Sequence, residues 1–464
     1  MKKVKKEYLF LMIILIFAFF LRVYSLGTPV FWVDEATSSV ASLMILEKGF
    51  PIFDSGLFYD RALLFHYLQA FFLLFGQTEF LARFVSVIFG LLTIVLIYFI
   101  GKEYSNSGGI ISALFLSVFY LEVFFSRQAR FYQFFQLLFF LSLYLLYKSK
   151  DDSRFLYLSL ISFFITINTQ IAGLVLAPFF ILHILIYNKG IKRWLSVFPS
   201  ISLFYNFIPS KDLSSNSSIS AINYFKEYAG QVLNMIYLFI LFVPGLIMAF
   251  MKKKRLTLLI ILPSVILLIG VFGLKSFALR YAYFFIFPLI LYSSLLMSFM
   301  YEKYGKLILV SIFILFLIPS NLFFLHTYVN MIKPVDYNFN DYSAPFTDYK
   351  NVPSELIDEM KKGILVSYFS SDVQWYIKKP DYVLPFSMNG IGEDSISWNC
   401  SIGVCDRYSG ALMLNEDLES YYLVADLFSV SKLNDEQRLR YEGLIEGCSL
   451  VWEQVDLKIY HCAI

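Results

Sequence analysis

The sequence predicts a polytopic α-helical membrane protein that ends in a small α/β domain. Hydrophobic residues make up 58% of its 464 residues and charged residues only 16%, and long apolar segments recur as far as residue 325. A soluble protein carries about 25% charged residues, so this composition excludes an ordinary soluble fold. Beyond residue 325 the sequence turns polar. We therefore expect a membrane domain at 1–325 and a second domain at 326–464.

The first apolar segment, residues 8–26, is long enough to cross a bilayer as a helix. It has no small-residue cleavage site and more apolar segments follow, so we interpret it as a retained signal anchor. Later apolar segments bring the expected total to about eleven spans. They lie near residues 80–100, 109–125, 131–147, 155–170, 171–187, 194–208, 230–251, 256–272, 281–300 and 306–325.

Clusters of Lys and Arg occur in every second connector. They lie at the N-terminus and at 101–102, 148–154, 189–193, 252–255 and 303–306. The positive-inside rule places them, and the N-terminus, in the cytoplasm. An odd number of spans then leaves the C-terminal domain outside. Residues 62–75 are too short to span and would invert this pattern, so we expect them to lie along the outer surface within a long outer segment, 27–79.

The C-terminal region has the pattern of a small α/β domain. We expect helices at Pro353–Lys362 and from an Asn434 N-cap to Glu446. Expected strands are Ile364–Phe369, Tyr421–Ala425, Ser449–Trp452 and Leu457–Tyr460. All four cysteines lie here, at positions 400, 405, 448 and 462. Because the domain is expected outside and no Cys-x-x-Cys spacing suggests a metal site, these cysteines predict two disulfides. Of the three possible arrangements, we expect the neighbours to pair, 400 with 405 and 448 with 462.

An acidic pair, Asp34 and Glu35, follows the first span. Carboxylates are costly near lipid and usually mark function. Asp34 or Glu35 is a candidate general base that would take a proton from an acceptor hydroxyl during sugar transfer. The alternative is structural, with Asp34 as the N-cap of a helix that runs to Leu46.

Asp60, Arg61 and His66 occur later in the same outer segment. Asp60 is a candidate metal ligand, because with Asp34 it would offer a divalent cation hard oxygen atoms. Arg61 or His66 could reach a phosphate. The alternative is a weak surface ion pair and a packed histidine.

The stretch Ser126–Tyr132 lies at the outer end of the third span and contains two arginines. Arg127 and Arg130 are candidate phosphate ligands, because a guanidinium group matches phosphate oxygens in pairs. Their alternative is snorkelling at the membrane edge. Arg280 would make a second phosphate contact or anchor the interface. Glu122 lies deeper in the span and should be paired or functional.

Four motifs occur in a characteristic order: Trp32–Ala36, Leu74–Gly76, Glu79–Phe84 and Ser126–Tyr132. Because these motifs occur in this order, the sequence resembles the polytopic GT-C glycosyltransferases over roughly residues 8–190. It is most similar to the family 39-like branch that holds protein O-mannosyltransferases and lipid A aminoarabinose transferases. The resemblance implies a GT-C-like membrane domain whose members take a sugar from a polyprenyl-phosphate carrier on the outer face.

The resemblance also implies roles for particular residues. Asp34 corresponds to the family's catalytic base or metal-side carboxylate, and Glu35 follows it in many relatives. Asp60–Arg61 aligns with an acidic-basic pair that precedes prolines, although Ala62–Leu64 replaces those prolines here. Arg130 and Tyr132 match the end of the second outer loop. Gln128 stands where relatives often have Glu, which leaves the need for a divalent metal open.

Residues and resemblance together predict a glycosyltransferase that moves a sugar from a polyprenyl-phosphate donor to a hydroxyl of a protein, lipid or glycan acceptor. We expect contact with membrane lipid, no nucleic-acid partner and no cofactor other than a divalent metal. Two alternatives stay open: a lipid-linked sugar flippase or transporter, and a structural protein that binds through its outer domain. A transporter usually shows internal repeats and polar residues at the midplane, which this sequence lacks.

Overall fold

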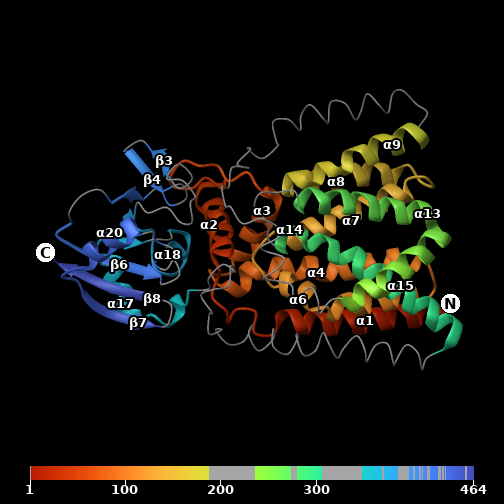
Figure 1. The fold of residues 1–464 in the computed structure, drawn as a ribbon, viewed down its shortest axis with the longest axis horizontal. Helices are drawn as coiled ribbons and strands as arrows, with labels where there is room; N and C mark the ends of the chain where they lie inside the picture. Colours follow the sequence, from red (N-terminus) through yellow and green to blue (C-terminus); the bar gives the residue numbers. More distant parts are fainter. Residues whose placement is uncertain are drawn as a thin grey trace.

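The computed structural model describes residues 2–187, 236–272, 279–305 and, with short gaps, 347–463. A helical bundle occupies one end of the molecule and a sheet domain the other (Figure 1). The elements of the bundle are α1 (Lys2–Val23), α4 (Glu79–Lys102), α5 (Gly108–Val118), α6 (Tyr120–Ser126), α7 (Tyr132–Lys148), α8 (Arg154–Thr169), η1 (Ile171–Leu176), α9 (Ala177–Tyr187), α13 (Ile236–Phe272), α14 (Leu279–Ala282), η2 (Tyr283–Phe285) and α15 (Ile286–Tyr304).

Three stretches within the described residues are long and apolar enough to cross a membrane: α4, Leu238–Val271 within α13, and Tyr283–Tyr304. Helices α5 and α6 add a fourth if they form one span across their 66° bend. The apolar helices support the predicted membrane protein. The expected spans at 194–208 and 306–325, and the domain boundary after residue 325, lie outside the described residues, so the span count stays a prediction.

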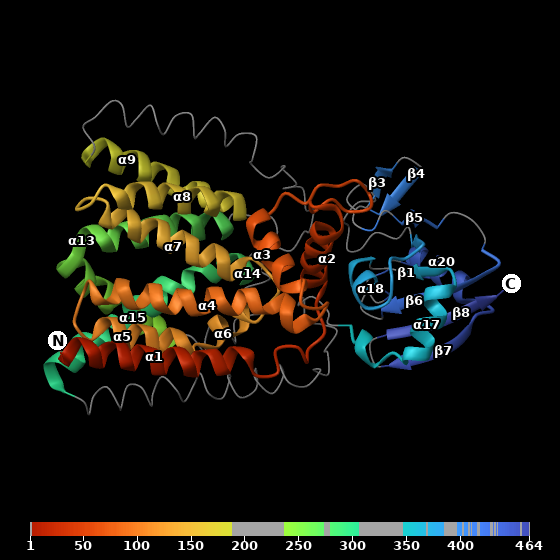
Figure 2. The same cartoon turned by 180° about the vertical axis from the view of Figure 1, so that it is seen from behind.

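Two helices lie across one end of the bundle, between it and the sheet domain (Figures 1 and 2). They are α2 (Val33–Lys48) and α3 (Leu63–Leu73). Helix α3 has 11 residues, too few to span, as the sequence predicted. The N-cap of α2 is Trp32, and Asp34 lies inside the first turn. The alternative that Asp34 is the N-cap is therefore wrong.

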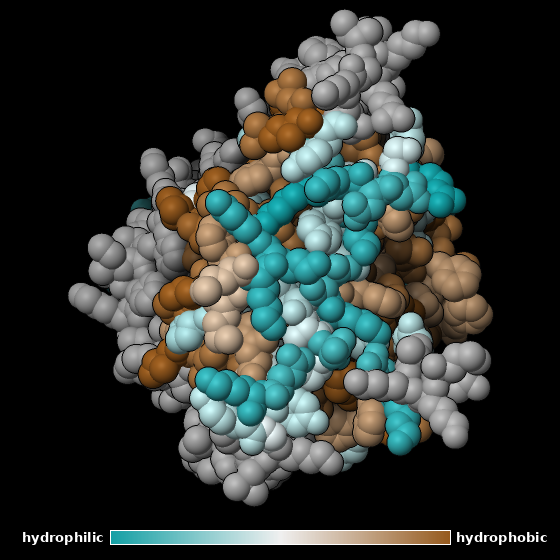
Figure 3. Space-filling view, turned by 90° about the vertical axis from the view of Figure 1, so that its right-hand side faces the viewer, coloured by the Kyte–Doolittle hydropathy of each residue, from teal (hydrophilic) through white to brown (hydrophobic). Residues whose placement is uncertain are grey.

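Polar residues gather at the opposite end of the bundle, where Figure 3 shows them as a band between apolar surfaces. Lys102 pairs there with Glu7 at 2.7 Å, and Lys148 pairs with Glu103 at 2.8 Å. The backbone of α13 breaks at Lys253 (φ −141°, ψ 61°), between the two spans expected at 230–251 and 256–272. The described basic residues Lys102, Lys148 and Lys253 thus lie at the end of the bundle away from the sheet domain.

Small residues let the helices of the bundle approach closely. A Cβ atom on Gly101 of α4 would lie 2.7 Å from the carbonyl oxygen of Gly108 at the start of α5. Between α5 and α15, the hydroxyls of Ser112 and Ser294 are 2.7 Å apart. Close backbone contact and hydroxyl hydrogen bonds of this kind stabilise helix packing where lipid removes the hydrophobic drive.

The described strands of the sheet domain form one sheet in the order β3-β4-β5-β2-β1-β6-β8-β7. Pairs β1–β2, β1–β6 and β2–β5 are parallel and the other neighbours are antiparallel. The strands are β1 (Leu365–Ser367), β2 (Tyr382–Val383), β3 (Ser397–Cys400), β4 (Gly403–Asp406), β5 (Leu412–Met413), β6 (Ser420–Asp426), β7 (Ser449–Gln454) and β8 (Leu457–Ala463). The described helices of this domain are α17 (Ser354–Lys362), α18 (Ser370–Tyr376) and α20 (Asp435–Ile445), with the short η3 (Tyr349–Asn351).

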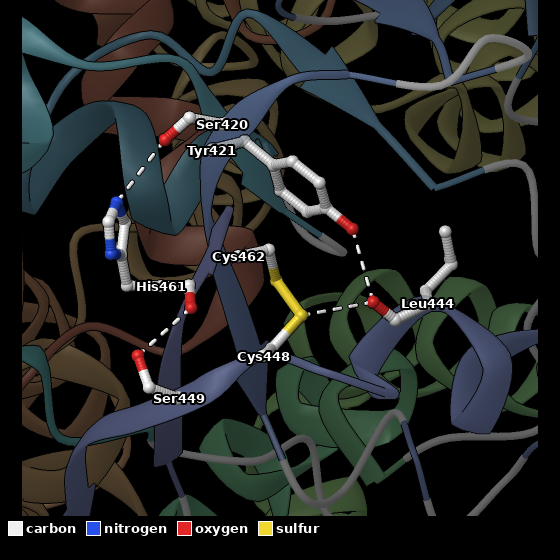
Figure 4. Close-up of a disulfide and its surroundings, with 7 residues drawn as sticks. All are labelled: Ser420, Tyr421, Leu444, Cys448, Ser449, His461 and Cys462. Atoms are coloured by element: carbon white, nitrogen blue, oxygen red, sulfur yellow. Dashed lines mark hydrogen bonds between the residues drawn. A yellow bond between two sulfur atoms is a disulfide. The ribbon is translucent and has the colours of Figure 1, made fainter. Parts of the chain in front are cut away.

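The four expected strands correspond to β1, β6, β7 and β8, and both expected helices, α17 and α20, are present. Cys448 and Cys462 form a disulfide, which confirms that predicted pair (Figure 4). The bond ties the start of β7 to β8, and Cys448 Sγ also lies 3.2 Å from the Leu444 carbonyl oxygen at the end of α20. The side chains of the other expected pair, Cys400 and Cys405, are outside the described set.

Candidate active site

Asp34 lies where α2 meets the turn between α6 and α7. Its side chain is 31% exposed, and its Oδ2 is 3.7 Å from Arg130 Nη2. The Tyr132 hydroxyl donates to the same oxygen at 3.3 Å. The structure thus brings together three residues that the sequence singled out from two separate outer loops.

Arg130 is fixed by α2 as well as by Asp34. Its Nη1 donates to the Asp34 carbonyl oxygen at 3.0 Å, to the Ser38 hydroxyl and, at 3.4 Å, to the Tyr59 hydroxyl. Its Nε is buried and has no hydrogen-bond partner within the described part of the chain. A guanidinium group held this way next to an open carboxylate can still offer donors to an anion.

Glu35 points away from Asp34 because consecutive helical residues are turned by about 100° around the axis. Its carboxylate is buried against Arg83 of α4, with Arg83 Nε to Oε1 and Nη2 to Oε2 both at 2.8 Å. The Ala129 N–H also donates to Oε1 at 2.6 Å. The other N–H groups of Arg83 donate hydrogen bonds to the carbonyl oxygens of residues 26, 29 and 30. Glu35 therefore ties both outer loops to α4.

Arg127 contacts the end of the first helix. Its Nη1 donates to the carbonyl oxygens of Arg22 at 3.0 Å and Tyr24 at 2.6 Å. The last carbonyl groups of a helix lack partners inside the helix, and a basic side chain satisfies them. The phosphate role expected for Arg127 stays a prediction, and in this structure its guanidinium group fixes the chain that leads to Asp34.

The Asp60–Arg61 pair precedes a strained residue. Arg61 is exposed and Asp60 is half-buried. Ala62 has φ 50° and ψ 42°, a left-handed conformation that costs a residue with a Cβ free energy. Its N–H donates to the Asn168 carbonyl oxygen at 3.1 Å, which joins the outer segment to the end of α8. Arg61 is thereby held at an exposed position beside the buried start of α3.

His66 is buried beneath the same segment. Its Nδ1 is 3.3 Å from the Ser42 hydroxyl, and its ring packs edge-on against Tyr59. Burial, together with the positive charge of Arg130, lowers the pKa of His66 to about 3. The ring is therefore neutral near pH 7, which supports the packed alternative over a charged contact to phosphate.

A divalent metal has little to bind in the described part of the chain. No three His, Cys, Asp or Glu side chains there gather as ligands. Gln128, at the position where the resemblance expects Glu, is buried. These residues do not form a metal site as they stand, and the expected metal role of Asp60 stays a prediction.

The remaining candidates lie on the bundle side. Arg280 belongs to α14, but its side chain is outside the described set. Glu122 is buried and paired, as expected, since it accepts from Gln136 Nε2 and from the Tyr283 hydroxyl, both at 2.7 Å. The ring of His183 is held between the Ser149 hydroxyl and Arg255.

Sequence reasoning missed two features of the site. One is Arg83, whose place in the second turn of the apolar helix α4 was the available signal. The other is α18, which contacts α2 through a hydrogen bond between Thr37 and Ser371 at 3.2 Å. Nothing in the local sequence of α18 signals a contact with residues more than 300 positions away.

Comparisons with known proteins point to the same fold. A family model described as dolichyl-phosphate-mannose-protein mannosyltransferase matches residues 60–208. A crystal structure of apo ArnT from Cupriavidus metallidurans matches with a TM-score of 0.65 at 11% identity, covering 99% of this chain and 98% of that one. The same protein bound to undecaprenyl phosphate matches with a TM-score of 0.60 at 11% identity, covering 98% of each chain.

The archaeal oligosaccharyltransferase AglB from Archaeoglobus fulgidus, in complex with an inhibitory peptide and a dolichol-phosphate, matches with a TM-score of 0.53 at 12% identity. That match covers 81% of this chain and 64% of AglB. A search of curated protein sequences found no match. The family model over residues 60–208 and the shared fold support the GT-C resemblance that the sequence showed.

Proposed function

We propose that this protein is a glycosyltransferase that moves a sugar from a polyprenyl-phosphate donor to an acceptor hydroxyl, with Asp34 as the general base. The observation that carries the proposal is the pairing of an accessible carboxylate with a buried arginine: Asp34 is 31% exposed, and Arg130 Nη2 lies 3.7 Å from it. The solved relative with undecaprenyl phosphate and the mannosyltransferase family model support the donor class.

The reaction follows from these two groups. Asp34 takes the proton of the acceptor hydroxyl as its oxygen attacks the anomeric carbon. The bond from that carbon to the polyprenyl phosphate breaks, and the phosphate leaves with an additional negative charge. Arg130 stabilises that charge from a fixed position, because its hydrogen bonds to α2 are already made before substrate binds. Arg61 and Arg280 are the further phosphate contacts in this proposal.

Glu35 takes a positioning role in this proposal in place of the catalytic role expected from the sequence. Both of its oxygens accept hydrogen bonds from Arg83, and its side chain is 1% exposed. A carboxylate with a buried guanidinium partner is a poor proton acceptor, since protonation would leave Arg83 as an uncompensated buried charge.

We place the N-terminus in the cytoplasm and the sheet domain outside. The hydrophilic band at one end of the bundle (Figure 3) is where Lys102 and Lys148 form their ion pairs, and the positive-inside rule assigns that end to the cytoplasm. In this orientation, donor and acceptor meet at the outer membrane surface, where the sheet domain covers the end of the bundle.

The test is transfer from a radiolabelled polyprenyl-phosphate sugar in membranes that contain the wild type or Asp34→Asn. We expect the variant to lose about 10²–10⁴-fold in transfer at unchanged expression, the usual contribution of a general base. Glu47→Gln, an exposed carboxylate of the same helix, is the matched control and should transfer normally. A chelator arm tests the metal. Wild-type rates in Asp34→Asn would disprove the base role, and labelled lipid that crosses liposomes without any product would favour a flippase.

A further inference from the structure

Helix α18 of the sheet domain docks beside Asp34. The Phe31 N–H, just before α2, donates to the Tyr376 hydroxyl at 2.7 Å. The rings of Phe31 and Trp375 lie 4.9 Å apart, and Thr37 donates to Ser371 at 3.2 Å. Thr37 follows Asp34 by three residues, so both lie on one side of α2. Figure 1 shows α18 at the face of the sheet domain nearest to α2.

This contact is reinforced outside the helix. Lys379, just after α18, pairs with Asp54 of the outer segment at 3.3 Å. Lys350 of η3 pairs with Glu79 at the start of α4 at 2.9 Å and donates to the carbonyl oxygen of Gly27 at 2.6 Å. Two charged contacts therefore flank the apolar and hydroxyl contacts of α18.

The same contact buries a carboxyl group, Asp372, next to Ser371. Asp372 is 3% exposed. Its Oδ1 is buried and has no hydrogen-bond partner among the described residues. Buried polar atoms without a partner are rare in proteins, and each one calls for a functional or structural explanation.

Asp372 lies between carboxylates of its own sheet domain and carboxylates of α2. Burial first, then the carboxylates of Asp426 on β6 and of Asp34 and Glu35 on α2, raise the pKa of Asp372 well above its usual value. Arg83 compensates Glu35, and Arg130 lies near Asp34. The uncharged form of Asp372 therefore fits beside Asp34, whereas the ionised form would repel it.

We propose that docking of α18 on α2 completes the transfer site, and that Asp372 is a positioning residue through which the sheet domain holds Asp34 and the acceptor in place. This inference rests on the proposed glycosyl transfer. It makes the sheet domain a required part of the enzyme, and it makes docking sensitive to the charge of one side chain. A pKa that is raised in the docked state favours docking at low pH, and docking weakens as pH rises through that pKa.

The docking itself is tested without any activity. Full-length protein with Thr37→Cys and Ser371→Cys is oxidised in membranes, and the cross-link is scored after proteolysis between the domains. We expect a cross-link at neutral pH because the native hydroxyl oxygens are 3.2 Å apart. Its yield should fall as pH rises, relative to the same pair in an Asp372→Asn background, which cannot ionise. Absence of the cross-link at every pH, or equal yields in both backgrounds, would overturn the proposal.

The role in transfer is tested by pH profiles of kcat/KM. Asp372→Asn should keep transfer within about threefold of the wild type at the low-pH end of the profile and should remove the fall that the wild type shows as pH rises, because its amide mimics the uncharged acid. Asp358→Asn is the matched control, an exposed aspartate of α17, and should retain the wild-type profile. The oxidised cysteine pair should stay active.

Two outcomes would contradict this role. A purely structural Asp372 would lower stability and leave the alkaline limb in place, and transfer lost on cross-linking but restored by reduction would mean that α18 must leave the site. If the wild type transfers no sugar from any donor, the proposed function fails while the cross-linking result still decides whether α18 docks in this way.

Discussion

Two neighbouring residues of α2 form acid–arginine pairs of opposite character. The Glu35–Arg83 pair is almost fully buried, with a 2.8 Å contact on each carboxylate oxygen. The Asp34–Arg130 pair has a 3.7 Å contact, and Asp34 is 31% exposed. The pairs differ because one residue along a helix turns the side chain from the entrance of the bundle to its interior.

This difference in burial assigns a structural role to Glu35 and a catalytic role to Asp34. A buried pair with complete hydrogen bonds holds structure, and its removal leaves an uncompensated charge. An accessible carboxylate with one loose partner can exchange a proton with a substrate. Residue type alone predicts the same chemistry for both acids, so burial and partner geometry assign the roles.

Breaking the buried pair should have the largest effect on stability. Glu35→Ala leaves Arg83 buried without its partner, and we expect the free energy of unfolding to fall by about 3–5 kcal/mol. Thermal unfolding in detergent measures this loss. Asp34→Ala is the matched control on the next residue, and because Asp34 is partly exposed its change should stay within about 1 kcal/mol. Equal losses for the two variants would remove the distinction between the pairs.

The open pair should be sensitive to guanidinium geometry. Arg130→Lys keeps the charge but loses the planar fork, so we expect transfer to fall by about 10-fold to 100-fold. Arg127→Lys is the matched control, because Arg127 donates to carbonyl oxygens that an ammonium group also satisfies. Steady-state transfer at varied donor concentration measures both. If Arg127→Lys loses as much as Arg130→Lys, the phosphate contact expected for Arg127 regains support.

Much of this organisation is predictable from sequence, because it depends on local patterns. The apolar stretch at 62–75 is visibly too short to span a membrane. Gly447, which follows the helix Asp435–Ile445 with φ 84°, marks the end of that helix. Asp34 and Arg130 were found because charges at the membrane edge are costly, and Tyr132 was found through the resemblance to the GT-C glycosyltransferases. Their convergence needed only the alternation of loops between two sides of a membrane.

The remaining parts depend on contacts between distant residues. Arg83 is a single arginine at the start of an apolar helix, and only the fold places it against Glu35. The strands β2 and β5 have two residues each, too short for a period-two pattern. The docking of α18 joins residues 37 and 371, and no local pattern encodes that pairing.

The smallest expected effect concerns His66 of α3, which is buried against α2. Its pKa is lowered to about 3 by burial and by Arg130, whereas an unfolded histidine titrates near 6.5. The unfolded chain therefore binds a proton that the folded protein excludes, so stability is complete above about pH 6.5 and falls by about 1.4 kcal/mol per pH unit below it.

His66→Gln cannot titrate and should remove this contribution, which thermal unfolding at pH 5.5 and 7.5 measures. His461, a half-buried residue of β8 in the sheet domain, gives the matched control variant His461→Gln, which should keep the wild-type slope. If His66→Gln keeps the wild-type slope, His66 does not cause the pH dependence, and its ring is accessible to protons rather than tightly packed.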